Sequence, residues 1–312
     1  MPVSAPVCLY SNRIAFDVRT DNKNSTAGVG YLAKAAISLG GLVWVYFLLR
    51  DIDWAGSMDR LQNVSLPLFA GSALAVSLVY CLRLMRLRLW VGRISQQRLA
   101  FFEWIDLYLL SIAIGSITPS RLGEFSRIYL LRNTGMETGE RVWVTVFDKL
   151  SDLLYIPVAI VLTAGVVGTK YGVSGNVLVL SGIVFLLAYF LLSYRFGRKL
   201  GRGALLAGWI FTGAGFFMFV SSNVLIFRAV DIGLNWLDIV AITVSVGALA
   251  SLPVSIAGIG VREGSLLALL EAWGVAPEAI PPVLVLEFII NILFPVLLLA
   301  LWRSGTVISR RN

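Results

Sequence analysis

The chain has 312 residues, of which 58% are hydrophobic and 14% are charged, and its formal net charge is +8. Soluble domains are about 45–50% apolar and about 25% charged, so this composition excludes an ordinary soluble protein. The sequence contains no histidine and two cysteines, which excludes histidine-based catalysis and the commonest zinc sites. The basic charge is typical of cytoplasmic loops that face anionic lipid, and it does not indicate nucleic-acid binding.

Long apolar runs predict an all-α polytopic membrane protein, because each is long enough to cross a bilayer of about 30 Å. In chain order, we expect spanning helices over residues 29–49, 66–82, 143–168, 177–194, 205–227 and 283–302. Two further apolar regions, 101–133 and 239–275, are interrupted by proline and glycine. The arginine-rich loops 83–98 and 195–202 are expected in the cytoplasm, together with both termini.

Each interrupted region is expected to form a broken, re-entrant hairpin, because the helices on either side require it to return to the face it entered. The charge count does not decide whether a hairpin dips halfway or crosses twice. The first hairpin would open on the cytoplasmic face and break at Pro119 and Gly123. The second would open on the outer face and break at Pro253, Gly258 and Gly260.

The two halves of the chain share one order of elements, which is helix, helix, broken hairpin, helix. Their expected orientations are opposite, so the sequence predicts two inverted-topology repeats, an arrangement that places transport sites near the membrane midplane. The expected domains are a polar cytoplasmic tail (1–28), a first transmembrane repeat (29–168), a second repeat (169–303) and a basic cytoplasmic tail (304–312).

Charged residues at the two hairpin tips are the first candidates for a binding site. Non-helical backbone at membrane depth persists only where protein buries it or where it lines a wet cavity. Arg121 and Glu124 lie at the first break, and Arg262 and Glu263 follow the second. Guanidinium groups and half-helix N-termini both bind anions, so Arg121 and Arg262 are predicted to hold a phosphate. Arg127 is either a further ligand or a residue of the lipid headgroup layer.

The closing helix of each half carries polar residues at matching places. Asp148 and Asp152 are spaced i, i+4 in the first half, and so are Glu287 and Asn291 in the second. A charge at the bilayer centre costs roughly 2.5–3.5 kcal/mol on insertion scales, so such groups pair or line a path. The carboxylates could bind an amine or a coupling proton. Alternatively, the two aspartates stay wet at the cytoplasmic edge, and Glu287 forms a structural ion pair with Arg262.

Three segments together resemble the transmembrane domain of the lysylphosphatidylglycerol synthase/flippase family. They are SITPSRLGEFSRIYLLR at 116–132, FDKLSDLL at 147–154 and SLPVSIAGIGVREGSLLALL at 251–270. The resemblance runs from about residue 30 to 303 and implies a stand-alone member of a domain that translocates lipids. Synthase activity in that family belongs to a separate soluble domain, so no enzymatic activity is expected here. The family commonly shows Glu-Arg where this sequence has Asp148 and Lys149, which leaves the headgroup open.

The residues and the resemblance together predict a flippase of the cytoplasmic membrane that moves a phospholipid, aminoacylated or not, between leaflets. The expected substrate-binding residues are Arg121, Glu124, Arg127, Asp148, Asp152, Arg262, Glu263 and Glu287. Two alternatives stay open: a carrier for polyprenyl phosphate or a polyprenyl-linked sugar, and a non-transporting accessory subunit of a lipid or cell-envelope enzyme. Expected partners are a membrane phospholipid and a separate lipid synthase or glycosyltransferase. A homo-oligomer is compatible with the sequence, and no cofactor, metal ion or nucleic acid is expected.

Overall fold

The computed structural model describes residues 54–95, 97, 99–154, 156–158, 160–161, 164, 168, 172, 174–250 and 261–309. All of the regular elements in these ranges are helices, which confirms the predicted all-α class. The expected helix at 29–49 lies outside the described residues, and so do the second-hairpin breaks at Pro253, Gly258 and Gly260.

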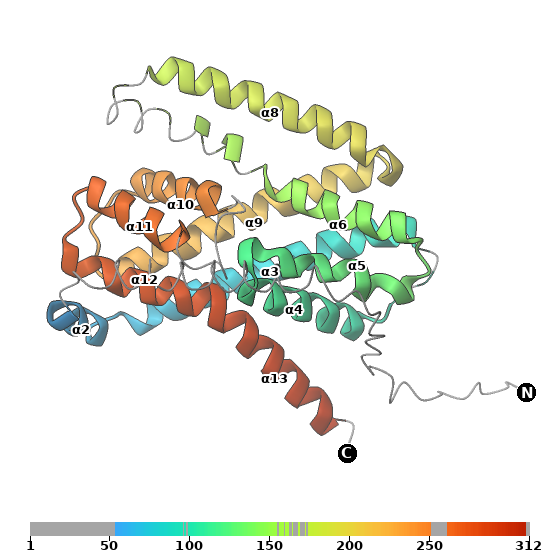
Figure 1. Ribbon diagram of the computed structural model, residues 1–312, viewed down its shortest axis with the longest axis horizontal. Helices are drawn as coiled ribbons and strands as arrows, with labels where there is room; N and C mark the ends of the chain where they lie inside the picture. Colours follow the sequence, from blue (N-terminus) through green and yellow to red (C-terminus); the bar gives the residue numbers. More distant parts are fainter. Residues whose placement is uncertain are drawn as a thin grey trace, which may run out of the picture. The chain divides into compact units, whose positions relative to one another are not determined.

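The helices follow one another along the chain as shown in Figure 1. They are α2 (Trp54–Gln62), α3 (Leu66–Ile94), α4 (Phe101–Ile117), η1 (Pro119–Ser126), α5 (Arg127–Leu130), η2 (Leu131–Thr134), α6 (Thr138–Asp152), α8 (Gly175–Gly197), η3 (Arg198–Leu200), α9 (Arg202–Ala229), α10 (Trp236–Ala250), α11 (Val261–Ala272), η4 (Pro277–Ala279), α12 (Ile280–Phe288), η5 (Ile289–Leu293) and α13 (Phe294–Ser309). Within the part of the chain that the structure describes, four continuous stretches are long and apolar enough to cross a membrane, namely Leu66–Ile94, Gly175–Leu200, Arg202–Ala229 and Pro277–Gly305. They bear out the prediction of a membrane protein with several spanning helices.

Helix α3 is longer than the sequence predicted. The expected span ended at 82 and was followed by a cytoplasmic loop at 83–98, but the helix continues to Ile94. The loop prediction was therefore wrong for Arg83, Arg86, Arg88 and Arg93, which all lie inside α3. Arginine is a good helix former, and its charge can be buried where carboxylates pair with it. A count of basic residues alone does not reveal such pairing.

Helix α6 also differs from the expected helix at 143–168. It begins at Thr138 and ends at Asp152, and Leu153 and Leu154 form a turn. Beyond this turn, the described residues 156–158, 160–161, 164 and 168 are again helical, so the predicted span is interrupted. Pro157 explains this end, because a proline has no N–H to donate to the carbonyl four residues earlier, which here belongs to Leu153.

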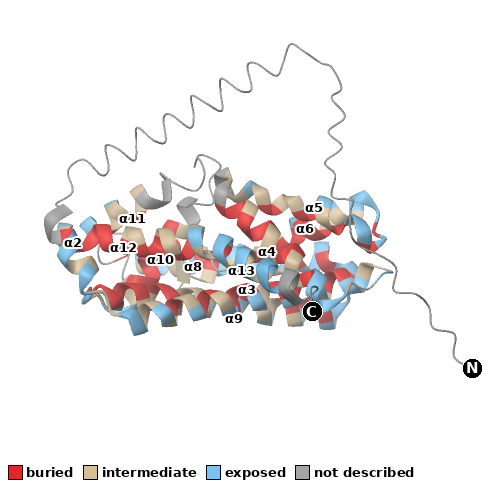
Figure 2. Ribbon diagram, turned by 90° about the horizontal axis from the view of Figure 1, so that it is seen from below, coloured by how far each residue is buried: buried red, intermediate tan, exposed pale blue. Residues whose placement is uncertain are grey.

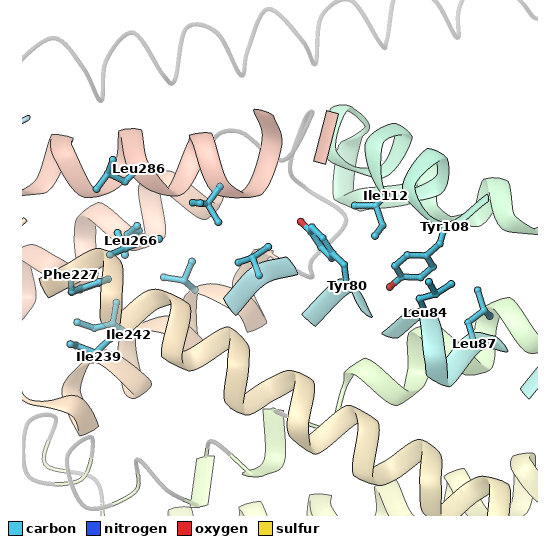
Figure 3. Packing of buried hydrophobic residues seen from close by; sticks show 14 of the residues in the cluster. Tyr80, Leu84, Leu87, Tyr108, Ile112, Phe227, Ile239, Ile242, Leu266 and Leu286 are labelled. Carbon is cyan, nitrogen blue, oxygen red and sulfur yellow. The ribbon is translucent and has the colours of Figure 1, made fainter. Parts of the chain in front are cut away.

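Most of the core in the described residues is a continuous apolar cluster, and Val240 and Val244 on α10 belong to a second, smaller one. Figure 3 shows part of the larger cluster, with Tyr80, Leu84 and Leu87 contributed by α3 and further side chains by α4 and α9 to α12. Helices α3 and α9 pack along one another, side by side in Figure 2. Gly208 permits this close approach, because a Cβ there would lie 2.5 Å from the indole of Trp90.

Helix α8 has a different environment. Its only buried residues are Gly182, Ser193 and Gly197, and large apolar side chains such as Phe185 and Leu191 are exposed. A helix that exposes this much apolar surface is suited to contact with lipid.

The predicted repeat compares two sets of helices. Helices α3, α4 and α6, with η1 and α5 between α4 and α6, are followed later by α9, α10, α11 and α12. The inverted symmetry that would relate these two sets stays a prediction.

Candidate functional site

The first hairpin is built from α4 and η1, which turns back against α4. Thr118 closes the turn, because its Oγ1 accepts a hydrogen bond from the Gly123 N–H at 2.7 Å and donates to Ile114 O at 3.0 Å. The close approach depends on two glycines. A Cβ on Gly123 would lie 2.5 Å from Ile114 O, and a Cβ on Gly115 would lie 2.5 Å from Glu124 Cγ.

The tip of this hairpin is Arg121, two residues after the proline that opens η1. Its backbone is left-handed, with φ at 55°, a conformation that is uncommon for residues other than glycine and that recurs at functional sites. Its side chain is 42% exposed, and Nη1 lies 3.9 Å from Glu124 Oε1. Arg121 therefore presents a partly accessible cation at the predicted break.

Eight charged side chains form a network that we call the charge cluster. Its members are Arg83 and Arg86 on α3, Arg121, Glu124 and Arg127 on η1 and α5, and Asp148, Lys149 and Asp152 on α6. Of the predicted site residues, the structure thus brings Arg121, Glu124, Arg127, Asp148 and Asp152 together. Arg83, Arg86 and Lys149 are additions.

Arg86 is at the centre of the cluster and is fully buried. Its Nε donates to Asp148 Oδ1 at 2.9 Å, and its Nη2 donates to Asp152 Oδ1 at 2.7 Å. Its Nη1 donates to Thr212 Oγ1 on α9 at 2.7 Å. One guanidinium therefore connects three helices. The sequence signal that could have found it is the apolar periodicity of α3, in which Arg86 falls one turn before the buried Trp90.

Arg127 holds the other side of the same aspartate. Its Nη1 lies 2.5 Å from Asp148 Oδ2, and its Nη2 lies 3.2 Å from Glu124 Oε2. Its Nε donates to Ser111 Oγ at 2.9 Å, and the guanidinium lies over the ring of Tyr108. Arg127 is buried, and each of its three guanidinium nitrogens donates one hydrogen bond. It is therefore placed to hold Glu124 and Asp148 in position.

Three cations form the rim of the cluster, namely Arg83, Arg121 and Lys149, whose side chains are 21%, 42% and 22% exposed. Arg83 Nη2 lies 3.7 Å from Asp152 Oδ2, and Lys149 Nζ pairs with Glu124. Among the ion pairs that join described residues, the five cations of the cluster exceed its three carboxylates by two. The excess sits at the rim, because the buried interior has two arginines and three carboxylates. An anion would therefore be attracted to the rim.

The residues predicted in the second half are described only in part. Glu287 is buried, and its Oε2 accepts a hydrogen bond from Asn291 Nδ2 at 2.7 Å. A π-helical turn, η5, contains Asn291 and precedes Pro295, which cannot donate to the Asn291 carbonyl. Arg262 and Glu263 lie in the first turn of α11, and their side chains are outside the described part. A pair between Arg262 and Glu287, and a meeting of the two hairpins, stay predictions.

An apolar groove of about 450 Å³ lies along the other side of α6. Its walls come from α6, from the turn and residues that follow it, and from α8. They include Phe147, Leu150, Ile156, Phe185, Leu192 and Phe196. Tyr189 on α8 spans the groove, where its hydroxyl donates to Ser151 O at 3.4 Å. Helix α6 therefore carries charged residues on one face and an apolar groove on another.

Comparison with known proteins agrees with this architecture. A membrane protein of Archaeoglobus fulgidus, named UPF0104 membrane protein, is 26% identical over 174 residues, which are 55% of this chain and 50% of the relative. The chain thus spans about half the length of this curated relative. Residues 31–298 match the family described as the lysylphosphatidylglycerol synthase TM region. Because the match covers most of the sequence, the chain belongs to the lysylphosphatidylglycerol synthase transmembrane-region family.

Proposed function

We propose that this protein moves a phospholipid between the leaflets of the cytoplasmic membrane and binds its headgroup phosphate at the rim of the charge cluster. The observation that carries the proposal is the excess of cations at the rim. Arg83, Arg121 and Lys149 are partly exposed above an interior in which Arg86 and Arg127 are fully paired. Guanidinium and ammonium groups are the side chains that bind phosphate best.

Because Lys149 and Arg83 already pair with carboxylates, phosphate binding would exchange one anionic partner for another. A phosphate at the rim would compete with Glu124 for Lys149 and with Asp152 for Arg83. No cation would have to lose its partner in a low-dielectric site, which is the costly event for buried charges. The released carboxylates would then be free to accept an amine, so the same site suits an aminoacylated or an amine-bearing headgroup.

The apolar groove beside α6 supports a lipid as the substrate. Its volume of about 450 Å³ falls within the range of about 300–1,000 Å³ that is usual for ligand pockets, and its apolar walls suit an acyl chain. The exposed apolar side chains of α8 would let the rest of the lipid stay in the bilayer. The protein would then enclose only the headgroup and part of one chain.

The second half would serve the opposite leaflet. Arg262, Glu263 and Glu287 would receive the headgroup there, and rocking of one repeat against the other would alternate access. In this arrangement both termini face the cytoplasm.

The test is a translocation assay in proteoliposomes that contain fluorescent phosphatidylglycerol, with dithionite quenching of the outer leaflet. Loss of one charge-assisted contact costs about 1.5–3 kcal/mol, so Arg121→Gln and Lys149→Gln should each slow translocation about ten- to hundredfold. Arg303→Gln is the matched control, because Arg303 pairs with Asp106 at the exposed end of α13. Wild-type rates in both rim variants would refute the assignment of the rim.

Two further lipids separate the alternatives. Movement of polyprenyl phosphate instead of phosphatidylglycerol would identify a polyprenyl-phosphate carrier with the same phosphate site. No movement of phosphatidylglycerol, lysylphosphatidylglycerol or polyprenyl phosphate would favour the accessory-subunit role.

A further inference from the structure

Three buried polar atoms along α6 and the neighbouring η1–α5 segment have no hydrogen-bond partner. They are Ser126 Oγ, Arg141 Nε and Thr145 Oγ1, and elsewhere in the described part of the chain only Thr243 Oγ1 on α10 shares this property. More than nine in ten buried polar groups have a partner, so three exceptions on one interface require an explanation. The rim and the paired interior of the charge cluster do not use these atoms.

Two contacts fix the register of the segments that carry these atoms. Lys149 on α6 pairs with Glu124 on η1, and Arg141 Nη1 donates to Ile128 O on α5 at 3.2 Å. The two segments therefore run antiparallel. Midway between these contacts, one segment has Ser126 and the other has Thr145. The two unpaired hydroxyls thus lie on neighbouring segments, each between the same two contacts.

The three groups are chemically suited to an oxyanion. Arg141 Nε–H can only donate, and the other two guanidinium nitrogens already donate to Ile128 O and Thr138 Oγ1. The hydroxyls of Ser126 and Thr145 can also donate. Three potential donors, one of them on a cation, call for an acceptor with several oxygens and a negative charge.

We propose that Ser126, Arg141 and Thr145 form a second anion site, which binds a phosphate group. Thr145 lies one turn along α6 from Lys149, and Arg141 lies one turn farther. A headgroup phosphate that leaves the rim at Lys149 would therefore meet these donors in succession. The role in headgroup movement rests on the proposed function, whereas anion binding by these three groups does not.

The test measures thermal unfolding of the purified full-length protein in nanodiscs, with inorganic phosphate titrated against chloride at equal ionic strength. Every protein compared, the reference protein included, carries Arg121→Gln and Lys149→Gln, so that the rim does not contribute to phosphate binding. A second arm uses water-soluble dihexanoyl phosphatidylglycerol. The variant Ser126→Ala/Thr145→Val removes both hydroxyls with little change of shape. Each lost hydrogen bond to a charged ligand weakens binding about tenfold or more, so the midpoint for phosphate should rise about a hundredfold. The matched control is Thr243→Val, which removes an equally buried and unpartnered hydroxyl on α10 and should leave phosphate binding unchanged.

Each outcome decides the proposal. Equal phosphate binding by the reference protein and the double variant, or no binding by either, would overturn the anion site. The site would also be overturned if Thr145→Val and Thr243→Val stabilised the phosphate-free protein equally and left phosphate binding intact. Loss of inorganic phosphate binding in the double variant supports the site. If dihexanoyl phosphatidylglycerol behaves in the same way, the site takes a lipid headgroup; if it does not bind, the headgroup role is overturned and a free-phosphate site stands. Phosphate binding by the reference protein together with no lipid movement by the wild type would refute the proposed function and leave the site intact.

Discussion

Replacement of Arg86 with methionine tests the central contact of the charge cluster. The variant keeps a long side chain between α3 and α6 but removes the guanidinium that lies 2.9 Å from Asp148 Oδ1 and 2.7 Å from Asp152 Oδ1. Breaking a buried ion pair by removing one partner costs about 3–5 kcal/mol, because the remaining charge stays desolvated. We therefore expect Arg86→Met to lower the free energy of unfolding by about 3–5 kcal/mol.

The measurement is a reversible SDS titration in mixed micelles, followed by circular dichroism. Arg121→Gln is the comparison, and its partly exposed contact should contribute about 0–1 kcal/mol. The double variant Arg86→Met/Asp152→Asn removes one charge of each sign. Its loss of unfolding free energy should therefore be smaller than the sum of the two single losses, by a coupling energy of about 1–3 kcal/mol. A loss below about 1 kcal/mol in Arg86→Met, or additive effects in the double variant, would refute the account of the cluster.

Three further changes test the hairpin, the α9 contact and the groove. Gly123→Ala should destabilise the protein by about 1–3 kcal/mol in the same titration, because its Cβ would meet Ile114 O at 2.5 Å; an unchanged midpoint would contradict the close approach. Thr212→Val removes the oxygen that accepts from Arg86 Nη1 and should cost about 1–3 kcal/mol, and an equally stable variant would show that this contact is dispensable. Leu150→Trp should fill part of the apolar groove and slow phosphatidylglycerol movement with little change in the unfolding midpoint; wild-type movement would exclude the groove as an acyl-chain site.

The helices and the first break could be predicted because they depend on local chemistry. Apolar length located α8 and α9 to within three residues at each end. Pro119 and Gly123 marked the turn between α4 and η1, since a proline and a closely packed glycine restrict the backbone wherever they occur. Pro157 also indicates the end of α6, but the apolar run led to the prediction of one continuous helix over 143–168.

The site was harder to predict, because its pairings are long-range. Asp148 and Asp152 were found from their spacing on one helix face, whereas Arg86 was assigned to a loop. Basic residues beyond an apolar run usually face the cytoplasm. The sequence does not show that Arg86 is buried by pairing with two aspartates more than 60 positions later. Lys149 lies on the same helix but pairs with Glu124 instead, so the two aspartates required a cation from another helix, and that requirement is the signal that would have prompted the search.

The two faces of helix α6 suggest how the protein could bind the phosphate and an acyl chain of one lipid at the same time. Asp148 and Asp152 point toward α3, whereas Phe147, Leu150 and Ser151 line the groove toward α8. In the proposed mechanism, a lipid with its phosphate at the rim and an acyl chain in the groove would contact two faces of this helix. Asp152 is the last residue of α6 and pairs with the rim residue Arg83, so phosphate binding at the rim would open that pair.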